Sequence, residues 1–358
     1  MPAPSERALG ASMKRLPRWV LVVSGCPAAA GGAHGFMVAT FAGSGAPGPI
    51  PGGVQPLDAP AALALGPAGI LYVADARNQD VRTIDPSGGI RWLAGGAAGA
   101  GYADGPPGAA RFLLPEGIAV SGAGLVYVAD THNNRIRTVD ASGDVATLAG
   151  DGTAGWRDGP GATAEFFAPH GLALDAIGNL YVADTLDHRI RKLDASGNVS
   201  TVAGSGVAGF ADGPGAAAQF SAPEGVAVDA AGNVYVADTG NDRIREIDPG
   251  GTVTTLAGNG AAAGCADGPG VSAELYRPAS VAVDATGQLF FADTGNHRIC
   301  RLDPSGSVET LAGNCAAGDS DGQGGAAQLA FPRGLAVDAT GHVYVADTGN
   351  NRIRKLSP

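Results

Sequence analysis

Short apolar runs, each about five residues long, alternate with turns along most of the chain. In residues 223–258, the segments 225–229 and 234–238 are apolar, 243–248 alternates polar and apolar side chains, and 253–257 forms a fourth run. The connecting segments are rich in Gly, Asn, Asp and Pro, which favour tight turns. This order predicts four short strands in an antiparallel meander, with one face of the third strand exposed.

The same pattern recurs throughout the sequence. Tyr-Val-Ala-Asp, replaced by Phe-Phe-Ala-Asp in one copy, recurs every 54 or 55 residues, and the six copies end at Asp75, Asp130, Asp184, Asp238, Asp293 and Asp347. A period of this length indicates a propeller, a solenoid or another repeat array. The first two runs of a unit are apolar throughout and the third is amphipathic. This gradient favours a propeller whose first strand lies at the central axis.

The two ends of the repeated region indicate that the repeats close into a ring. A fourth-strand pattern at residues 38–43 precedes the first unit, whereas the last unit ends after its third strand at 352–356. An open solenoid with these ends would leave unpaired strand edges, which promote aggregation. We therefore predict an all-β fold over residues 37–358. It is a six-bladed β-propeller of four-stranded antiparallel blades, closed by an N-terminal strand that completes the last blade.

Residues 1–36 do not follow the repeat. Lys14, Arg15 and Arg18 precede a short apolar stretch at 19–23, and residues 23–26 resemble a bacterial lipoprotein box. This pattern predicts a signal or lipoprotein segment and therefore an extracytoplasmic protein, either secreted or lipid-anchored. The alternative is an unstructured leader on a cytoplasmic protein. The sequence contains no run of 18 apolar residues, so we expect no transmembrane span.

The overall charge narrows the classes of partner. The formal net charge is −11, which disfavours nucleic-acid binding because phosphate contacts need clustered Lys and Arg. We expect a monomer whose partner is a protein or a small-molecule ligand.

The most regular copy carries a family resemblance. Gly-Leu-Ala-Val-Asp at 334–338, followed by Val-Tyr-Val-Ala-Asp-Thr-Gly-Asn-Asn-Arg-Ile-Arg at 343–354, resembles the NHL repeat. The resemblance extends over about residues 37–356 and implies a propeller that binds partners. Because fold and function separate readily, it leaves the ligand open.

One position varies between blades where its neighbours repeat. The residue after the Pro that precedes each first strand lies at the mouth of the expected central channel, and around the ring it is Ala61, Glu116, His170, Glu224, Ala279 and Arg333. Glu116, His170, Glu224 and Arg333 are therefore the candidate ligand-binding residues. A His with two carboxylates can bind a divalent cation, so Glu116, His170 and Glu224 are tentative metal ligands. The sequence indicates no other cofactor with certainty. The alternative is a water-filled mouth whose Glu and Arg charges balance.

A second resemblance favours a different function. Pro-His-Gly at 169–171 resembles the motif that supplies zinc-binding histidines in the peptidyl-hydroxyglycine lyases, which share the propeller. It implies an extracytoplasmic metal-dependent lyase or hydrolase that uses the Glu, His, Glu and Arg set. Only His170 matches that motif, and we identify no catalytic residue. The sequence therefore favours a non-enzymatic binding or scaffold module, with the channel mouth and rim loops as its surface.

The repeated Asp and Arg residues point to a structural role, because a catalytic pair is needed once and these occur in nearly every blade. We expect each Asp to accept backbone N–H groups of the turn that follows it. The residues concerned are Asp130, Arg135, Asp184, Arg189, Asp238, Arg243, Asp347 and Arg352.

The long loops between blades carry two further features. Tyr102, Trp156 and Phe210 each lie two residues before an Asp-Gly pair, and we expect these rings to fasten each loop to its own blade. Cys265 and Cys315 lie in the loops on either side of the fifth blade. They could pair in an oxidising compartment, whereas free, partly buried thiols are the alternative.

Overall fold

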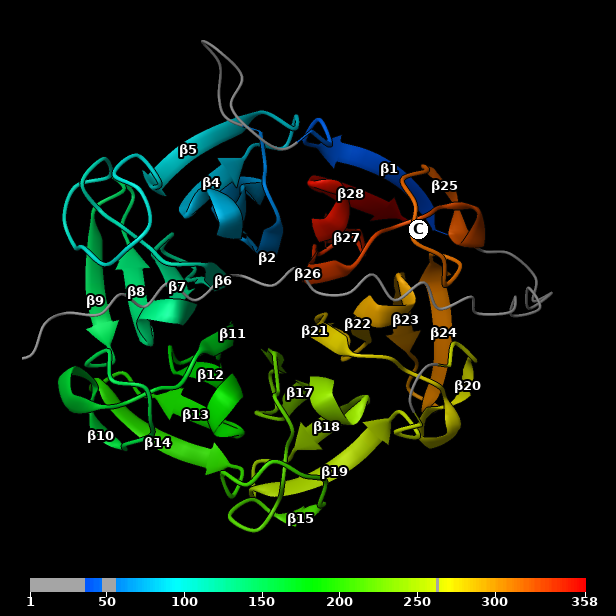
Figure 1. Ribbon diagram of the computed structural model, residues 1–358. Coiled ribbons are helices and arrows are strands. Elements are labelled where there is room, and N and C mark those ends of the chain that lie inside the picture. Colours follow the sequence, from blue (N-terminus) through cyan, green and yellow to red (C-terminus); the bar gives the residue numbers. More distant parts are fainter. Residues whose placement is uncertain (1–35, 47–55, 262–263) are drawn as a thin grey trace, which may run out of the picture.

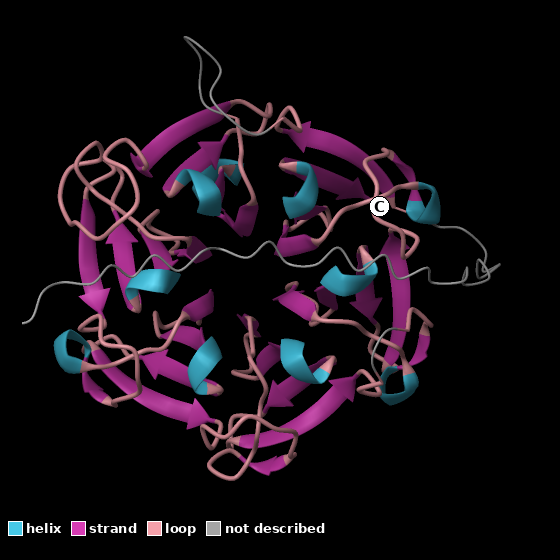
Figure 2. Cartoon of the chain, in the orientation of Figure 1, coloured by secondary structure: helices cyan, strands magenta, loops and turns pink. Residues whose placement is uncertain are grey.

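The computed structural model describes residues 36–46, 56–261 and 264–358. These residues form six antiparallel sheets arranged as blades around a central axis, which confirms the predicted six-bladed β-propeller (Figure 1). Within each blade the first strand lies nearest the axis and the fourth lies at the outer edge (Figure 2). The predicted signal or lipoprotein segment, apart from Phe36, lies outside the described residues.

Each blade contains four main strands, which follow one another from the axis to the outer edge. Blade one is β2 (Pro60–Leu65), β3 (Leu71–Asp75), β4 (Asp80–Ile84) and β5 (Ile90–Gly95), and blade two is β6 (Pro115–Val120), β7 (Val126–Asp130), β8 (Arg135–Val139) and β9 (Val145–Ala149). Blade three is β11 (Pro169–Leu174), β12 (Leu180–Asp184), β13 (Arg189–Leu193) and β14 (Asn198–Ala203), and blade four is β16 (Gly225–Val228), β17 (Val234–Asp238), β18 (Arg243–Ile247) and β19 (Thr252–Ala257). Blade five is β21 (Pro278–Val283), β22 (Leu289–Asp293), β23 (Arg298–Leu302) and β24 (Ser307–Ala312), and blade six is β26 (Pro332–Val337), β27 (Val343–Asp347), β28 (Arg352–Ser357) and β1 (Met37–Ala42).

Four blades have a fifth strand that the sequence pattern did not predict. It is a two-residue segment of the loop before the blade, and it pairs with the outer strand of that blade. These segments are β10 (Gly159–Pro160), β15 (Gly213–Pro214), β20 (Gly268–Pro269) and β25 (Gly322–Gln323). Part of each of these long loops therefore lies along the outer strand of the blade that it precedes.

Short 3-10 turns are the helical elements of the described chain. In every blade one such turn joins the second strand to the third, and a residue in the left-handed region ends it. These turns are η2 (Ala76–Asn78), η3 (Thr131–Asn133), η5 (Thr185–Asp187), η6 (Thr239–Asn241), η8 (Thr294–Asn296) and η10 (Thr348–Asn350). The others are η1 (Pro67–Gly69), η4 (Gly161–Thr163), η7 (Gly270–Ser272) and η9 (Gly324–Ala326).

The hydrophobic core consists of layers between neighbouring blades. Between blades two and three, for example, Ile136 and Ala149 of one blade pack with Leu180 and Val182 of the next, and the loop residue Phe166 is fully buried among them. Because the first two strands have blades on both sides, their side chains are apolar on both faces. This explains why these runs do not alternate in the sequence.

The ring closes as the sequence predicted. β1 pairs antiparallel with β28, Val38 opposite Leu356 and Thr40 opposite Arg354, so the N-terminal strand completes the blade that the C-terminal strands begin (Figure 1). On its other edge β1 pairs with β25, Val38 opposite Gly322. Both edges of β1 are therefore paired within the ring.

The repeated Asp is fully buried and binds a buried arginine. In blade four, Asp238 accepts hydrogen bonds from Arg245 Nη1 at 2.7 Å and from the Ser221 backbone N–H at 2.8 Å. Asp212 of the long loop accepts from the same guanidinium, at 3.0 Å from Nε and 2.5 Å from Nη2. Two details differ from expectation. The N–H group comes from the loop before the blade rather than from the following turn, and the arginine is the second of the repeat, not Arg243.

Other blades repeat this arrangement of one arginine between two aspartates. Each set joins the end of the second strand, the third strand and the preceding loop. The sets are Asp130–Arg137–Asp104, Asp184–Arg191–Asp158, Asp293–Arg298–Asp267 and Asp347–Arg354–Asp321. In blade one, Arg82 binds Asp75 and Asp80.

The first arginine of the repeat, Arg243 in blade four, makes different contacts. Arg243 lies over the Phe210 ring, 3.9 Å from its centroid, and its Nη2 donates to the Asn259 carbonyl at 3.0 Å. Arg135 over Tyr102 and Arg189 over Trp156 repeat this stack at 3.9 and 4.1 Å. The prediction that these aromatic residues fasten each loop to its own blade is confirmed, with a cation–π contact as the fastening.

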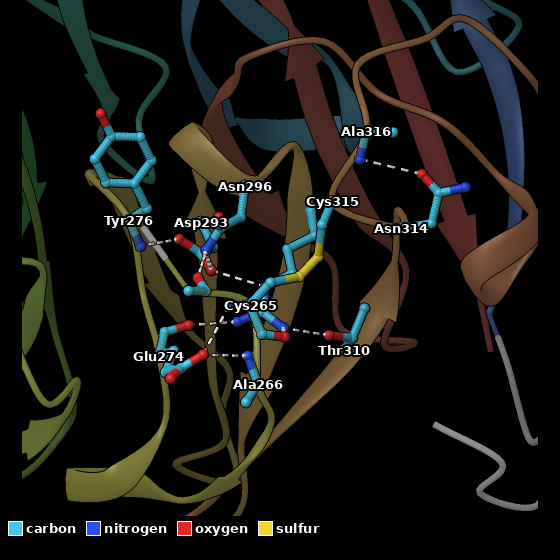
Figure 3. The surroundings of a disulfide bond; sticks show 12 residues. Cys265, Ala266, Glu274, Tyr276, Asp293, Asn296, Thr310, Asn314, Cys315 and Ala316 are labelled. Atoms are coloured by element: carbon cyan, nitrogen blue, oxygen red, sulfur yellow. Dashed lines mark hydrogen bonds and ion pairs between the residues drawn. A yellow bond between two sulfur atoms is a disulfide. The ribbon is translucent and has the colours of Figure 1, made fainter. Parts of the chain in front are cut away.

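Blade five fastens its loop by different chemistry. Cys300 occupies the place of the second arginine, and Arg298 has turned inward to bind Asp293 at 2.7 Å. The site of the arginine–aromatic stack is therefore free. Cys265 lies where the loops before blades two, three and four carry the aromatic residue, and it forms a disulfide with Cys315 (Figure 3).

Cys315 also replaces a repeated residue, the second glycine after the fourth strand. At the equivalent Gly206, an added Cβ would collide with the Arg189 guanidinium, so glycine makes room for the stacked arginine. With Arg298 turned inward, blade five has space for the Cys315 side chain, which keeps the left-handed backbone of the glycines at φ 64°. Of the two interpretations of these cysteines, the structure has the paired one, whereas Cys300 is a buried free thiol.

We expect reduction of the Cys265–Cys315 disulfide to lower the free energy of unfolding by about 2–4 kcal/mol, because the bond closes a long loop in the unfolded chain. The bonded residues are 50 apart in sequence. Thermal melting with and without reductant measures the change. The Cys265→Ser/Cys315→Ser variant is the control: it should melt like the reduced wild type and ignore reductant. Equal melting of oxidised and reduced wild type would contradict the prediction.

Candidate binding site at the channel mouth

The six ring residues lie together, as the repeat predicted. Ala61, Glu116, His170, Glu224, Ala279 and Arg333 all line a narrow cavity on the axis. Its volume is about 70 Å³, enough for a few water molecules. The innermost strands β2, β6, β11, β21 and β26 carry five of these residues, and Glu224 immediately precedes β16.

A glycine after each polar ring residue brings neighbouring first strands close together. The Gly171 N–H donates to the Glu224 carbonyl of the next blade at 2.8 Å. An added Cβ at Gly171 would collide with that carbonyl, and one at Gly117 would collide with the carbonyl of His170. The Pro-x-Gly pattern therefore sets the narrow bore of the mouth.

The four charged or titratable ring residues form one connected set. His170 Nε2 lies 2.8 Å from Glu116 Oε2. Arg333, from blade six, reaches both glutamates, with Nη2 2.8 Å from Glu224 Oε2 and Nη1 3.5 Å from Glu116 Oε1. We call this set the mouth network. The sequence indicated its members, but not that Arg333 joins the two glutamates.

The mouth network controls the ionisation of its members. Burial opposes the charge on Glu116, but the hydrogen bond from His170 and the positive charges of His170 and Arg333 outweigh it and lower the pKa of Glu116 to about 2. Burial also opposes the charge on Arg333, yet Glu224 and Glu116 raise the pKa of Arg333. Glu116 is therefore a carboxylate at any physiological pH and a weak base.

The predicted metal ligands do not form a cluster that could hold a metal ion as they stand. Within the described ranges, no three His, Cys, Asp or Glu side chains gather closely enough to hold a metal ion. Arg333 binds both Glu116 and Glu224, and its positive charge opposes a cation there. Metal binding by Glu116, His170 and Glu224 stays a prediction.

A wider cavity of about 420 Å³ adjoins the narrow one, and Glu224, Ala279 and Arg333 line both. We call the wider cavity the vestibule. Arg77, Tyr276, Arg277 and Phe331 also line it. The sequence reasoning missed these four residues, because it compared the blades at one ring position only.

Hydrogen bonds between neighbouring blades build the rim of the vestibule. In each blade, the residue after the 3-10 turn that joins the second and third strands has a left-handed backbone, and its side chain accepts a backbone N–H from the next blade. The residue that donates this N–H also has a positive φ. The acceptors and donors are Gln79 and Leu114, Asn134 and Ala168, His188 and Ala222, Asp242 and Arg277, His297 and Phe331, and Asn351 and Ala59, at 2.6–3.1 Å. We call these bonds the rim latches.

Comparison with known proteins places the chain in a family. The family model "NHL repeat" matches residues 112–145, 275–302 and 329–356, each of which covers the loop end and inner strands of one blade. A protein named NHL repeat-containing protein 2, from Homo sapiens, is 29% identical over 334 residues, which is 80% of this chain and 44% of that protein. The chain is an NHL-repeat β-propeller.

Two further matches carry names that do not mention the NHL repeat. The model "SMP-30/Gluconolactonase/LRE-like region" matches residues 179–266. Protein SUPPRESSOR OF QUENCHING 1, chloroplastic, from Arabidopsis thaliana, is 32% identical over 274 residues, 72% of this chain and 26% of that protein. The NHL propeller thus spans between about a quarter and under half of the length of these two curated relatives.

Solved structures share the fold at low identity. A protein of unknown function from Bacteroides thetaiotaomicron has a TM-score of 0.69 at 17% identity, over 90% of this chain and 76% of that one. A gluconolactonase from Xanthomonas campestris has a TM-score of 0.56 at 15% identity, over 84% and 87%. Virginiamycin B lyase from Staphylococcus aureus, with quinupristin, has a TM-score of 0.52 at 15% identity, over 86% and 83%. At these identities the likeness concerns the fold alone.

No helix in the described part of the NHL propeller has the length and apolar character needed to cross a membrane.

Two rim latches should respond to pH. His188 Nδ1 accepts the Ala222 N–H at 3.0 Å and His297 Nδ1 accepts the Phe331 N–H at 3.1 Å, which requires neutral imidazoles. Burial lowers the pKa of both histidines in the folded protein; for His188, Asp187 acts in the opposite direction and Arg189 in the same one. The stabilisation is thus present above the ordinary pKa of about 6.5 and is lost as the pH falls through the lowered pKa.

We expect the His188→Asn/His297→Asn variant to lose less stability than the wild type between pH 7 and pH 5, by roughly 0.5–1.5 kcal/mol per latch. Asparagine already makes the equivalent bonds at Asn134 and Asn351. Denaturant unfolding at both pH values measures the difference. The reverse change, Asn134→His, should add pH sensitivity. Identical pH slopes in all three proteins would contradict the assignment.

Proposed function

We propose that this NHL propeller is a non-catalytic binding module that takes a protein or small-molecule ligand at the channel mouth and rim loops. The observation that carries the proposal is the mouth network. Its four residues come from four different blades and satisfy one another at 2.8–3.5 Å. Such a set gives a fixed, asymmetric pattern of charge that a ligand can recognise.

The ionisation of the mouth favours binding over acid–base catalysis. A general base works best with a pKa near the operating pH, whereas the pKa of Glu116 is about 2. Arg333 holds both carboxylates of the network, and His170 already contacts Glu116. Glu116 is therefore unsuited to take a proton from a substrate near neutral pH.

Variation around the ring supports a specific ligand. The Asp and Arg of the buried pairs repeat from blade to blade. The ring position instead changes from blade to blade, and polar side chains occur at four of its six places. The acceptors of the rim latches vary too, but each accepts a backbone N–H, whereas the polar ring side chains contact one another across the mouth. We therefore assign the ring position to recognition.

Localisation and assembly follow as part of the proposal. The Cys265–Cys315 disulfide suits an oxidising compartment, and it supports the interpretation of residues 1–36 as a signal or lipoprotein segment. We propose an extracytoplasmic monomer.

The competing function is a metal-dependent lyase or hydrolase that uses Glu116, His170, Glu224 and Arg333. The contact of 2.8 Å between His170 and Glu116 favours it, because a carboxylate is a common partner of a metal-binding histidine. Structural neighbours named as a lyase and a gluconolactonase share the fold. A lyase or hydrolase of this kind would have to displace Arg333 from both glutamates before the metal could bind.

Titration calorimetry with Zn²⁺, Ca²⁺ and Mn²⁺ separates the two functions. We expect no saturable heat for any of the three ions, because Arg333 is bound to both of the carboxylates that a metal would need. A heat seen in the wild type and lost in His170→Ala would contradict the proposal and favour the metal enzyme.

A thermal-shift screen of small molecules tests binding itself. Ligands of the mouth should raise the melting temperature of the wild type but not of Glu224→Gln. The matched control is Glu309→Gln, at an exposed ion pair with Arg301 on the outer strand of blade five. If ligand shifts persist unchanged in Glu224→Gln, the mouth is not the binding site.

A further inference from the structure

Three equivalent positions around the vestibule each carry a single arginine. The turn position is the middle residue of the 3-10 turn between the second and third strands: Arg77, His132, Leu186, Gly240, Gly295 and Gly349. The rim position is the residue that donates the backbone N–H of a rim latch: Ala59, Leu114, Ala168, Ala222, Arg277 and Phe331. The ring position, defined above, is Arg333 in blade six. Arg277 belongs to blade five, Arg333 to blade six and Arg77 to blade one. These blades are consecutive around the ring, and all three arginines line the vestibule.

The space for a ligand lies on the same side. Blades five and six have glycine at the turn position, and Gly295 and Gly349 line the vestibule. Across the mouth, blades two and three have His132 and Leu186 there, and Leu186 is 47% exposed. The volume of about 420 Å³ falls within the range of small-molecule sites.

The charge of Arg277 is the least compensated of the three. Arg333 is held by two glutamates, and Arg77 lies 3.8 Å from Asp58 with its side chain 71% exposed. Among the described residues no hydrogen bond or ion pair reaches the Arg277 guanidinium. Asp242 accepts the backbone N–H of Arg277 at 2.6 Å, and the positive charge of Arg277 favours the ionised form of Asp242. Arg277 therefore offers a guanidinium that can bind an external anion.

Aromatic side chains flank this cation. Phe331 is 53% exposed at the vestibule, and its ring packs edge-on against His297 at 4.4 Å between centroids. Tyr276 lies next to Arg277 in the chain, and Asp293 fixes its backbone by accepting its N–H at 2.7 Å. An exposed and a half-buried ring beside an arginine suit a ligand with an apolar, planar body and an anionic group.

We propose that the vestibule binds a small organic anion, with its carboxylate or phosphate at Arg277 and Arg77 and its apolar body against Phe331 and Tyr276. The Arg333–Glu224 ion pair bounds the inner end of the site. This inference rests on the proposed binding function and adds the chemical class of the ligand. An arginine can hold a carboxylate or a phosphate through two parallel hydrogen bonds, which makes the contact both strong and directional.

Calorimetry at constant ionic strength tests the class of ligand. The probes are benzoate, phenyl phosphate and inorganic phosphate, with benzamide as the uncharged counterpart of benzoate. We expect benzoate or phenyl phosphate to bind and benzamide to be at least about tenfold weaker, since the charge-assisted bonds are lost. Inorganic phosphate, which lacks the apolar body, should bind more weakly than phenyl phosphate.

Variants locate the site. Arg277→Gln should weaken the binding of the anion at least about tenfold, and Phe331→Ala should weaken phenyl phosphate more than inorganic phosphate. The matched control is Arg91→Gln, an exposed arginine on the outer strand of blade one, which should bind like the wild type. Equal binding by the wild type and Arg277→Gln would overturn the assignment.

The outcomes distinguish this inference from the proposed function. If no anion binds while neutral or cationic molecules give shifts that Glu224→Gln abolishes, the anion site is wrong and the binding function stands. If neither the anions nor the wider screen gives any response, both are wrong. If benzamide binds as well as benzoate, the arginines do not select the ligand and the inference fails.

Discussion

In blades two to six, a buried arginine shared between two aspartates holds the blade to the loop that precedes it, and the rest of the structure depends on this contact. Arg137, Arg191, Arg245, Arg298 and Arg354 are each less than 2% exposed. Burying these charges is costly: burial raises the pKa of Asp184 to about 7, despite the opposing effects of Arg191 and of the Phe167 N–H. A buried ion pair contributes geometry more reliably than stability. In this propeller it fixes where the long loop runs before it turns inward to the channel mouth.

Blade five keeps this contact through Arg298 but has a disulfide where other blades have the arginine–aromatic stack. Once Cys300 replaces the second arginine, Arg298 moves inward and the arginine–aromatic stack is lost. Cys265 and Cys315 then tie the loops before blades five and six together. Those two loops end at Arg277 and Phe331 in the vestibule wall. The blade that departs most from the repeat is therefore beside the site where recognition is proposed.

The fold could be predicted from the sequence because the repeat supplies six copies of the same pattern. Closure followed from the separated fourth strand at residues 38–43, and the ring residues were placed together because equivalent positions must converge on the axis. The partners of the arginines could not be predicted. Arg243 and Arg245 are two residues apart and share one face of β18, so alternation does not tell which of them is the inner one. The contacts of Arg333 with both glutamates could not be predicted either, because they join side chains from blades that are far apart in the sequence. The same is true of the vestibule, whose lining comes from several blades.

The central claim is that the loop aspartate and the buried arginine hold the rim in place, and hydrogen exchange tests it most directly. Asp212→Ala removes the loop's ion pair with Arg245. It leaves the hydrogen bonds from Arg245 to the Ala211 and Gln219 carbonyls and the Asp238–Arg245 pair intact. We predict that amides in the loop 204–222 exchange at least about tenfold faster than in the wild type, which matches the loss of a hydrogen bond to a charged group. Amides of β17 and β18 should keep their protection. Unchanged exchange in the loop, or equal acceleration throughout blade four, would contradict the account.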